Sequence, residues 1–271
     1  MSLPWNKSVR LRLSPQAVAA TLEDRWPRRA QLATASQPGD AFDPDRIQGA
    51  DGARADGADR ARLIDLALLE LENSCSLRGA MLHAVLDDSL VHVDVAKGDF
   101  AGHSEHQLKA IAQACVAEML GDAALHREVR WSLQPDEKHL VICAVDREIV
   151  GVLGEAAGAR AMRMASLQSS FASCWNTFAR TQPTAQMVFV VASEVHAVVA
   201  CVLRRSICAL STGPWRASPA STDKARILDS RVDRLLACMG IDKAEMGGFV
   251  AVVPDGAAAA LSARWAEAIA A

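Results

Sequence analysis

The amino-acid sequence predicts an α/β protein built from two related halves, each with the element order βββαβα. The stretch from Met187 to Leu210, MVFVVASEVHAVVACVLRRSICAL, contains three apolar runs separated by short polar turns, which is the pattern of a β-meander. Apolar residues at helical spacing follow it, and then a short all-apolar run that is typical of a buried strand. The residues before Pro183 follow a longer version of the same order. Together these observations predict a structural repeat.

The composition indicates a soluble protein without a nucleic-acid partner. The chain has 271 residues, enough for one large domain or two smaller ones, and its net charge of −3 provides no basic surface for a polyanion. No apolar run approaches the roughly 20 residues that span a bilayer, and the N-terminus lacks the apolar core of a signal peptide. The seven cysteines are scattered without the spacing of a zinc or redox motif. We therefore expect reduced thiols, a cytoplasmic location and no direct membrane insertion.

The first half begins with two predicted strands and a loop. Val9 to Leu13 alternates apolar and basic residues, as a half-buried strand does. Ser14-Pro15 is a turn signal, and Ala17 to Leu22 returns as the second strand. Residues 34–60 are rich in Asp, Gly, Ala and Arg and have almost no large apolar side chains. They are predicted to form a long mobile loop, because they bury too little surface to offset their ordering entropy.

The residues after this loop are predicted to form further strands. Leu66 to Leu71 is predicted to form a strand, with a short helix as the alternative. Met81–Leu86 and Leu90–Val95 are predicted to pair as a hairpin, which places His83 opposite His92. A cross-strand pair is the ordinary explanation of these two histidines.

The clearest helix of the sequence lies between Ser104 and Gly121. Ser104 and Gln107 form a capping box, apolar residues share one face, and Gly121 supplies the C-terminal stop. The rest of the first half is predicted to form two strands, a helix, a short strand and a final helix, at Val129–Leu133, His139–Val145, Arg147–Ala157, Met162–Leu167 and from Ser169 or Ser170 onward.

The second half is predicted to begin after Pro183, which divides the chain into residues 1–182 and 183–271. Its meander is apolar throughout, so its strands are expected to be central and covered. The predicted elements are three strands, a helix, a strand and a last helix, at Met187–Ala192, Val195–Leu203, Ser206–Leu210, Thr222–Met239, Phe249–Val253 and around Leu261, Trp265 and Ile269.

This order of elements resembles that of the actin, Hsp70 and sugar-kinase superfamily, whose halves are ribonuclease-H-like. Within it, four stretches are similar to the actin-like assembly-platform proteins of type IV pili and type II secretion, of the PilM and GspL cytoplasmic-domain kind. These stretches are MLHAVLDDSLVHVDVAKG, the segment from His139 to Asn176, the meander from Met187 to Leu210, and RVDRLLACMGID. The similarity covers roughly residues 79–253 and implies an actin-like fold.

In the superfamily that the chain resembles, phosphate loops occupy the first turn of each meander, and glycines after the late strand border the nucleotide. Glycine lets backbone N–H groups approach the phosphate, and aspartate holds the metal. Here the turns are Ser14-Pro15 and Ser193-Glu194-Val195, and Pro254-Asp255-Gly256 follow the late strand, where Asp255 is more simply a helix N-cap. We expect no cofactor and no catalysis. The residues that would contact a nucleotide, if one bound, are Ser193, Glu194, Asp255 and Gly256.

One histidine pair has a spacing found in metal sites. His103 and His106 flank Glu105, but His103 precedes the expected N-cap Ser104, so the two rings need not share a helix face. We predict that they are exposed polar residues and that the protein holds no metal. The sequence also has no Gly-x-Ser-x-Gly elbow and no P-loop.

Two functions from different classes are consistent with these observations. The resemblance implies a catalytically silent scaffold of a bacterial type IV pilus or type II secretion inner-membrane assembly platform. Such a scaffold would bind the cytoplasmic tail of an inner-membrane partner, contact the assembly ATPase and be peripheral to the membrane through these partners. The alternative is a divergent actin-like ATPase or small-molecule kinase, with Glu194 as its metal-side acid. We favour the scaffold because the phosphate loops depart from the superfamily pattern.

Overall fold

The structure is a computed structural model that describes residues 7–24, 30–38, 50–179, 186–193, 196–214 and 221–252. Its contacts divide the chain into two compact units. The first unit contains the residues up to Leu90 together with Asp146–Ser169, and the second contains Val91–Val145 and the residues from Ser170 onward. Among the described helices, none combines the length and the hydropathy that crossing a bilayer requires.

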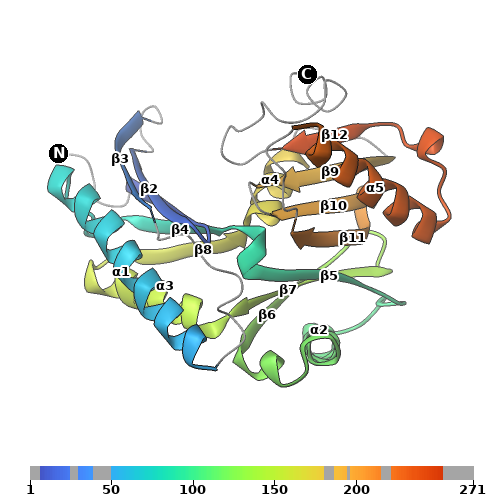
Figure 1. The fold of residues 1–271 in the computed structure, drawn as a ribbon. Coiled ribbons are helices and arrows are strands. Elements are labelled where there is room, and N and C mark those ends of the chain that lie inside the picture. The colour runs from blue at the N-terminus through green and yellow to red at the C-terminus, as the bar shows by residue number, and fades with distance from the viewer. Residues whose placement is uncertain are drawn as a thin grey trace. The chain divides into compact units, whose positions relative to one another are not determined.

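The first unit is a five-stranded sheet with two helices (Figure 1). The strand order is β3-β2-β1-β4-β8, in which β1 to β3 are antiparallel neighbours and β4 and β8 continue in parallel to β1. Helices α1 and α3 pack side by side against this sheet. The elements are β1 Lys7–Leu13, β2 Ala17–Asp24, β3 Ala30–Pro38, α1 Ala50–Ser74, β4 Met81–Leu86, the 3-10 turn η3 Asp88–Leu90, α3 Arg147–Ala159 and β8 Arg163–Ser169.

The second unit contains two sheets. The larger has the order β11-β10-β9-β12, with β12 parallel to β9 and the other neighbours antiparallel, and the smaller has the order β5-β7-β6. Helix α5 covers one face of the larger sheet and α4 the other, and α2 packs against the smaller sheet (Figure 1). The elements are β5 Val91–Lys97, α2 Glu105–Leu120, η4 Gly121–His126, β6 Arg127–Leu133, β7 His139–Asp146, α4 Ser170–Phe178, β9 Gln186–Ala192, β10 His196–Leu203, β11 Ser206–Pro214, α5 Ser221–Met239, η5 Lys243–Glu245 and β12 Phe249–Val252.

The central strand β9 is apolar throughout because both of its faces are buried. Val188 and Val190 pack in the cluster that includes Leu228 of α5, whereas Phe189 packs on the opposite face with Phe171 of α4. The side chains of Val188, Phe189, Val190 and Phe171 are each at most 2% exposed. Burial on both faces is what removes the usual alternation of polar and apolar residues from a strand.

The two larger sheets share one topology, so the structural repeat predicted from the sequence is present in the backbone. In each, the second strand of a meander lies between the first and the third, and a later strand adds in parallel to the first. The predicted last helix, around Leu261, Trp265 and Ile269, lies outside the described residues. The division into residues 1–182 and 183–271 follows this repeat along the sequence and stays a prediction. The two compact units divide the chain differently. The smaller sheet and α4 precede Pro183 in the sequence, but they pack with the sheet that contains β9.

The predicted mobile loop at residues 34–60 is wrong in its described parts. Residues 34–38 belong to β3, which pairs with β2, and residues 50–60 belong to α1, while residues 39–49 lie outside the described residues. An edge strand is held by backbone hydrogen bonds and needs few apolar side chains. The first turns of α1 mix Ala and Arg, which are good helix formers, with Asp and Gly, which are poor ones. The buried Ile64, Leu68 and Leu71 further along anchor the helix. The strand predicted for Leu66–Leu71 is therefore also wrong, and the helix kept as its alternative is the element that forms.

The predicted hairpin of residues 81–86 and 90–95 is also wrong. Strand β4 pairs in parallel with β1 and β8, and β5 pairs antiparallel with β7 in the other unit. The Nδ1 atom of His83 lies 2.9 Å from Oγ of Ser166 in β8, whereas His92 pairs with Ala144 in β7. A turn signal marks where a strand ends but does not determine the strand with which it pairs.

Helix α2 has the ends that the sequence predicts. The backbone N–H of Gln107 donates to Oγ of Ser104 at 3.3 Å, and the backbone N–H of Ser104 donates to Oε1 of Gln107 at 2.8 Å. Gly121 follows with φ +56°, a left-handed value that favours glycine. The next predicted helix is longer than expected, because α3 continues through Gly158 to Ala159.

Candidate functional site

The turn between β1 and β2, at the place of the first phosphate loop, is closed by its own serine. The hydroxyl of Ser14 accepts hydrogen bonds from the backbone N–H groups of Gln16 at 3.3 Å and Ala17 at 2.9 Å. The N–H of Ser14 donates to the carbonyl of Ala17 at 2.9 Å, and Pro15 has no N–H. Every backbone N–H from Ser14 to Ala17 is therefore engaged inside the turn or absent.

The turn after β9 has the same hydrogen-bond pattern at the ends that the structure describes. The N–H of Ser193 donates to the carbonyl of His196 at 2.8 Å, and the N–H of His196 donates to Oγ of Ser193 at 3.2 Å. Ser193 is one of the four residues predicted to contact a nucleotide, and the other three, Glu194, Asp255 and Gly256, lie outside the described residues.

A groove of about 520 Å³ lies on the second unit beside the turn between β10 and β11. Its apolar part is built on Phe189, whose ring centroid lies 5.3 Å from that of Trp175 and 5.2 Å from that of Phe178. These aromatic contacts hold both rings in place while leaving each of them partly exposed. The lining residues are Ser132, Leu133, Gln134, Pro135, Trp175, Phe178, Ala179, Met187, Arg204 and Arg205.

Arg204 and Arg205 form the two-residue turn that borders this groove. Leu203 pairs with Ser206, so the two arginines alone reverse the chain. Their φ angles of +50° and +68° are left-handed, which costs a non-glycine residue roughly 1–2 kcal/mol. Asn-Gly is the relaxed choice for such a turn. Two exposed cations thus occupy a strained position beside an aromatic groove, an arrangement suited to an acidic and partly apolar segment.

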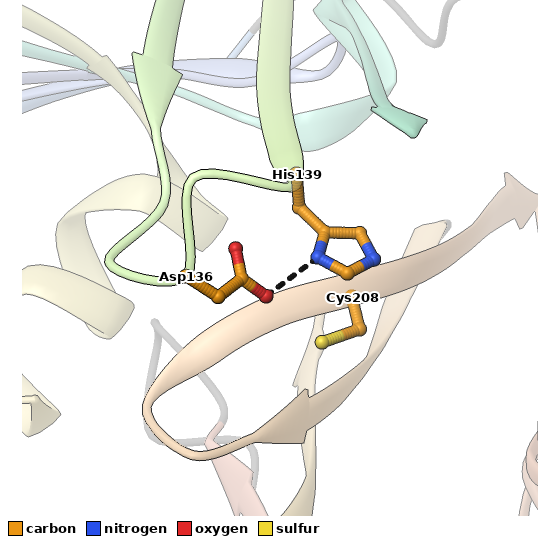
Figure 2. Close-up of side chains that lie close together, drawn as sticks. All are labelled: Asp136, His139 and Cys208. Carbon is orange, nitrogen blue, oxygen red and sulfur yellow. Dashed lines mark hydrogen bonds and ion pairs between the residues drawn. The ribbon is translucent and has the colours of Figure 1, made fainter. Parts of the chain in front are cut away.

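Asp136, His139 and Cys208 come together in the second unit (Figure 2). Nδ1 of His139 lies 2.7 Å from Oδ2 of Asp136, and one donor atom from each of the three residues lies within 4.8 Å of the other two. Burial acts to raise the pKa of Asp136, but hydrogen bonds from the backbone N–H of Lys138 and from His139 outweigh it and lower this pKa. Asp136 is therefore a carboxylate at neutral pH.

Cys208 owes its position to a β-bulge. In the ladder between β10 and β11, Cys201 pairs with Ala209 and Val202 with Ile207, which leaves Cys208 without an opposite residue in β10. A bulge redirects the side chain of the extra residue. The Cys208 side chain is buried, and this burial raises the pKa of its thiol, which is therefore protonated at neutral pH.

Two hydrogen bonds join the β6–β7 turn to the start of β11. The N–H of Asp136 donates to Oγ of Ser206 at 3.2 Å, and the N–H of Ile207 donates to Oε1 of Gln134 at 3.0 Å. Both Ser206 and Gln134 are buried polar residues. Breaking either bond would leave a buried polar group unsatisfied, so the two segments are held together.

The histidine pair singled out in the sequence does not join a metal-ligand group in the part of the chain that the structure describes. His103 and His106 are both exposed. The ring of His103 instead contacts the ring of Phe100 edge-on, with centroids 6.1 Å apart. The exposed positions agree with the prediction made for these residues.

Sequence reasoning missed the cluster of Asp136, His139 and Cys208. The spacing of Asp136 and His139 is visible in the sequence, as is a tight turn between two strands. The approach of Cys208 is not, because it depends on a bulge and on the packing of β11 beside β5.

No protein-family model matches the sequence, and no curated protein matches it. Solved structures are similar in fold. A protein of Bacteroides thetaiotaomicron with an actin-like ATPase fold and unknown function matches with a TM-score of 0.57, over 92% of this chain and 81% of that chain, at 9% identity. This chain has an actin-like fold.

Two further solved structures are similar to this chain in fold. The PilM-PilN type IV pilus biogenesis complex matches with a TM-score of 0.60 and 15% identity, over 93% of this chain and 84% of that chain. The cytoplasmic domain of EpsL, an inner membrane component of the type II secretion system of Vibrio cholerae, matches with a TM-score of 0.53 and 8% identity, over 92% and 82%. The fold predicted from the sequence is confirmed, and identities this low show the fold alone.

Proposed function

We propose that this actin-like chain is a catalytically silent scaffold of a bacterial type IV pilus or type II secretion inner-membrane assembly platform. In this role it binds the cytoplasmic segment of a membrane partner, contacts the assembly ATPase and is peripheral to the inner membrane through these partners. The likeness to the PilM-PilN complex and to the EpsL cytoplasmic domain supports this choice by analogy of fold.

The observation that carries catalytic silence is the closed turn between β1 and β2. A phosphate cradle needs backbone N–H groups that point at the ligand. In this turn Ser14 engages the N–H groups of Gln16 and Ala17, and Pro15 has none to offer. Binding a phosphate here would require these internal hydrogen bonds to break first.

The partner segment is proposed to lie in the groove beside Arg204 and Arg205. Trp175 and Phe178 offer ring faces for apolar side chains, and the two guanidinium groups offer paired donors for carboxylates. A short segment that carries acidic residues next to an aliphatic or aromatic one fits this chemistry. Such segments bind by burying one anchor and pairing charges around it.

A nucleotide-binding measurement tests the proposed absence of catalysis. Titration of the full chain with Mg-ATP in a calorimeter is expected to give no binding in the micromolar range. The divergent ATPase or kinase would instead be supported by micromolar affinity that Glu194→Gln abolishes. The control Glu245→Gln, at an exposed position of the second unit, would have to leave that affinity unchanged.

A pull-down tests the proposed binding of a membrane partner. The bait is this chain, and the prey is the bitopic membrane protein encoded beside a secretion or pilus ATPase in the same genome. The full-length partner is expected to be retained, and a partner lacking its cytoplasmic tail is expected to be lost. Equal retention of both forms would contradict capture of the tail.

A further inference from the structure

Three side chains with different metal-binding atoms converge between the β6–β7 turn and β11 (Figure 2). Carboxylate oxygen, imidazole nitrogen and thiolate sulfur are the ligand types that zinc takes in proteins. We propose that Asp136, His139 and Cys208 bind one Zn²⁺ ion, with water in the fourth position. The zinc site does not depend on the scaffold function proposed above.

The separations of the donor atoms suit a zinc ion. Ligand bonds of zinc to oxygen, nitrogen and sulfur place the donors of a tetrahedral site about 3.5 Å apart. Here the closest pair, Oδ2 of Asp136 and Nδ1 of His139, is 2.7 Å apart, and the other separations are at most 4.8 Å. These values bracket the required spacing, so small movements of the side chains admit the ion.

The charges and protons balance on binding. The Asp136 carboxylate and the Cys208 thiolate neutralise the two charges of Zn²⁺. The thiol loses one proton to solvent as its sulfur bonds the metal. The proton that Nδ1 of the neutral imidazole shares with Oδ2 of Asp136 moves to Nε2, which leaves both Nδ1 and Oδ2 to bind the ion.

The surrounding hydrogen bonds hold the ligands in place before the ion arrives. The N–H of Lys138 donates to Oδ1 of Asp136 at 3.1 Å, which leaves Oδ2 directed at the site. Cys208 is positioned by its bulge, and its thiol donates to the carbonyl of Ser206 at 3.3 Å until the thiol proton is lost on metal binding. The side chains of His139 and Asp136 are 15% and 26% exposed, so the ion has access from the turn.

Binding would link the two segments that border the groove. Pro135 precedes Asp136 in one wall, and Arg205 lies three residues before Cys208 in the other. A zinc ion is therefore expected to reinforce the hydrogen bonds that already join the β6–β7 turn to β11.

A cobalt and zinc titration of the tag-free, EDTA-treated full chain tests the proposal. Co²⁺ is expected to produce a thiolate-to-cobalt charge-transfer band at one equivalent per chain, and Zn²⁺ to displace it with a Kd on the order of micromolar or tighter. Calorimetry in buffers of different ionisation enthalpy is expected to show release of about one proton per zinc at pH 7. Absence of the charge-transfer band in the folded wild-type chain would overturn the proposal.

Variants separate this site from adventitious thiol binding. Cys208→Ser is expected to remove the band and to weaken zinc binding at least about 100-fold, and His139→Gln to weaken it similarly. Cys238→Ser, at an exposed cysteine of the same unit, should bind as the wild type does. Zinc should raise the melting temperature of the wild type and of Cys238→Ser but of neither site variant. If Cys208→Ser and His139→Gln both bind zinc like the wild type, the site is wrong.

Discussion

Val199→Asp is expected to lower the free energy of unfolding by at least about 3–5 kcal/mol, the cost of burying an unpaired charge. Val199 is fully buried in β10, between β9 and β11, within an apolar cluster that Leu228 and Val232 of α5 complete. A whole domain has only about 5–15 kcal/mol of stability. Most of the variant protein is therefore expected to be unfolded or insoluble at 37 °C.

Thr212→Asp provides the matched control. Thr212 lies in the neighbouring strand β11, but it is exposed, so the same carboxylate remains in water. Its free energy of unfolding is expected to stay within about 0.5 kcal/mol of the wild type. Urea denaturation followed by circular dichroism measures both variants. A soluble Val199→Asp chain with wild-type stability would contradict the two-sided burial of this sheet.

The elements that could be predicted from the sequence are those specified by neighbouring residues. The capping box of Ser104 and Gln107 and the stop at Gly121 are local, and they locate α2. The β9–β11 meander is also local, because each strand pairs with the next along the chain across a short turn. The repeat was predicted from the order of elements, but the third strand of the first meander, β3, was not predicted.

The wrong predictions concern strands and helices whose stability comes from distant partners. Strand β4 ends in a turn signal, yet its neighbours β1 and β8 are far away in sequence. The first turns of α1 lack large apolar residues, and the buried residues that anchor the helix lie further along it. The local pattern therefore predicted the limits of β4 but not its partner strands. It also did not predict where α1 begins.

The features of the candidate site also differ in how far the sequence could predict them. One part of the β1–β2 turn could be anticipated, because the sequence shows that Pro15 has no N–H; the closure by the Ser14 hydroxyl was seen only in the structure. The groove and the cluster around Cys208 could not, because each combines the β6–β7 turn with the β10–β11 hairpin, about 70 residues later. The left-handed backbone of Arg204 and Arg205 carries no sequence signal, since arginine is not a residue that such turns favour.

Replacing Arg204-Arg205 by Asn-Gly is expected to separate stability from binding. Both arginines have left-handed φ angles, and Asn-Gly adopts this turn with little strain. The free energy of unfolding is expected to rise by roughly 1–3 kcal/mol, because the strain of two non-glycine residues is relieved. The affinity for the proposed partner's acidic segment is expected to fall at least about tenfold, the equivalent of 1.4 kcal/mol, since two charge-assisted contacts would be lost.

The opposite directions of these two effects make the test discriminating. Arg204→Glu with Arg205→Glu should abolish binding without the gain in stability. The charge-matched control is Lys109→Glu with Arg234→Glu, which changes exposed residues of the same unit away from the groove. This control should change neither the free energy of unfolding nor the affinity strongly. Denaturation curves and calorimetric titration with the tail peptide measure the two quantities. If Asn-Gly raises stability and leaves binding unchanged, the arginines do not contact the partner. If it lowers stability, the turn is not strained. A gain in stability together with a loss of binding is the combination expected where a strained turn is kept for its function.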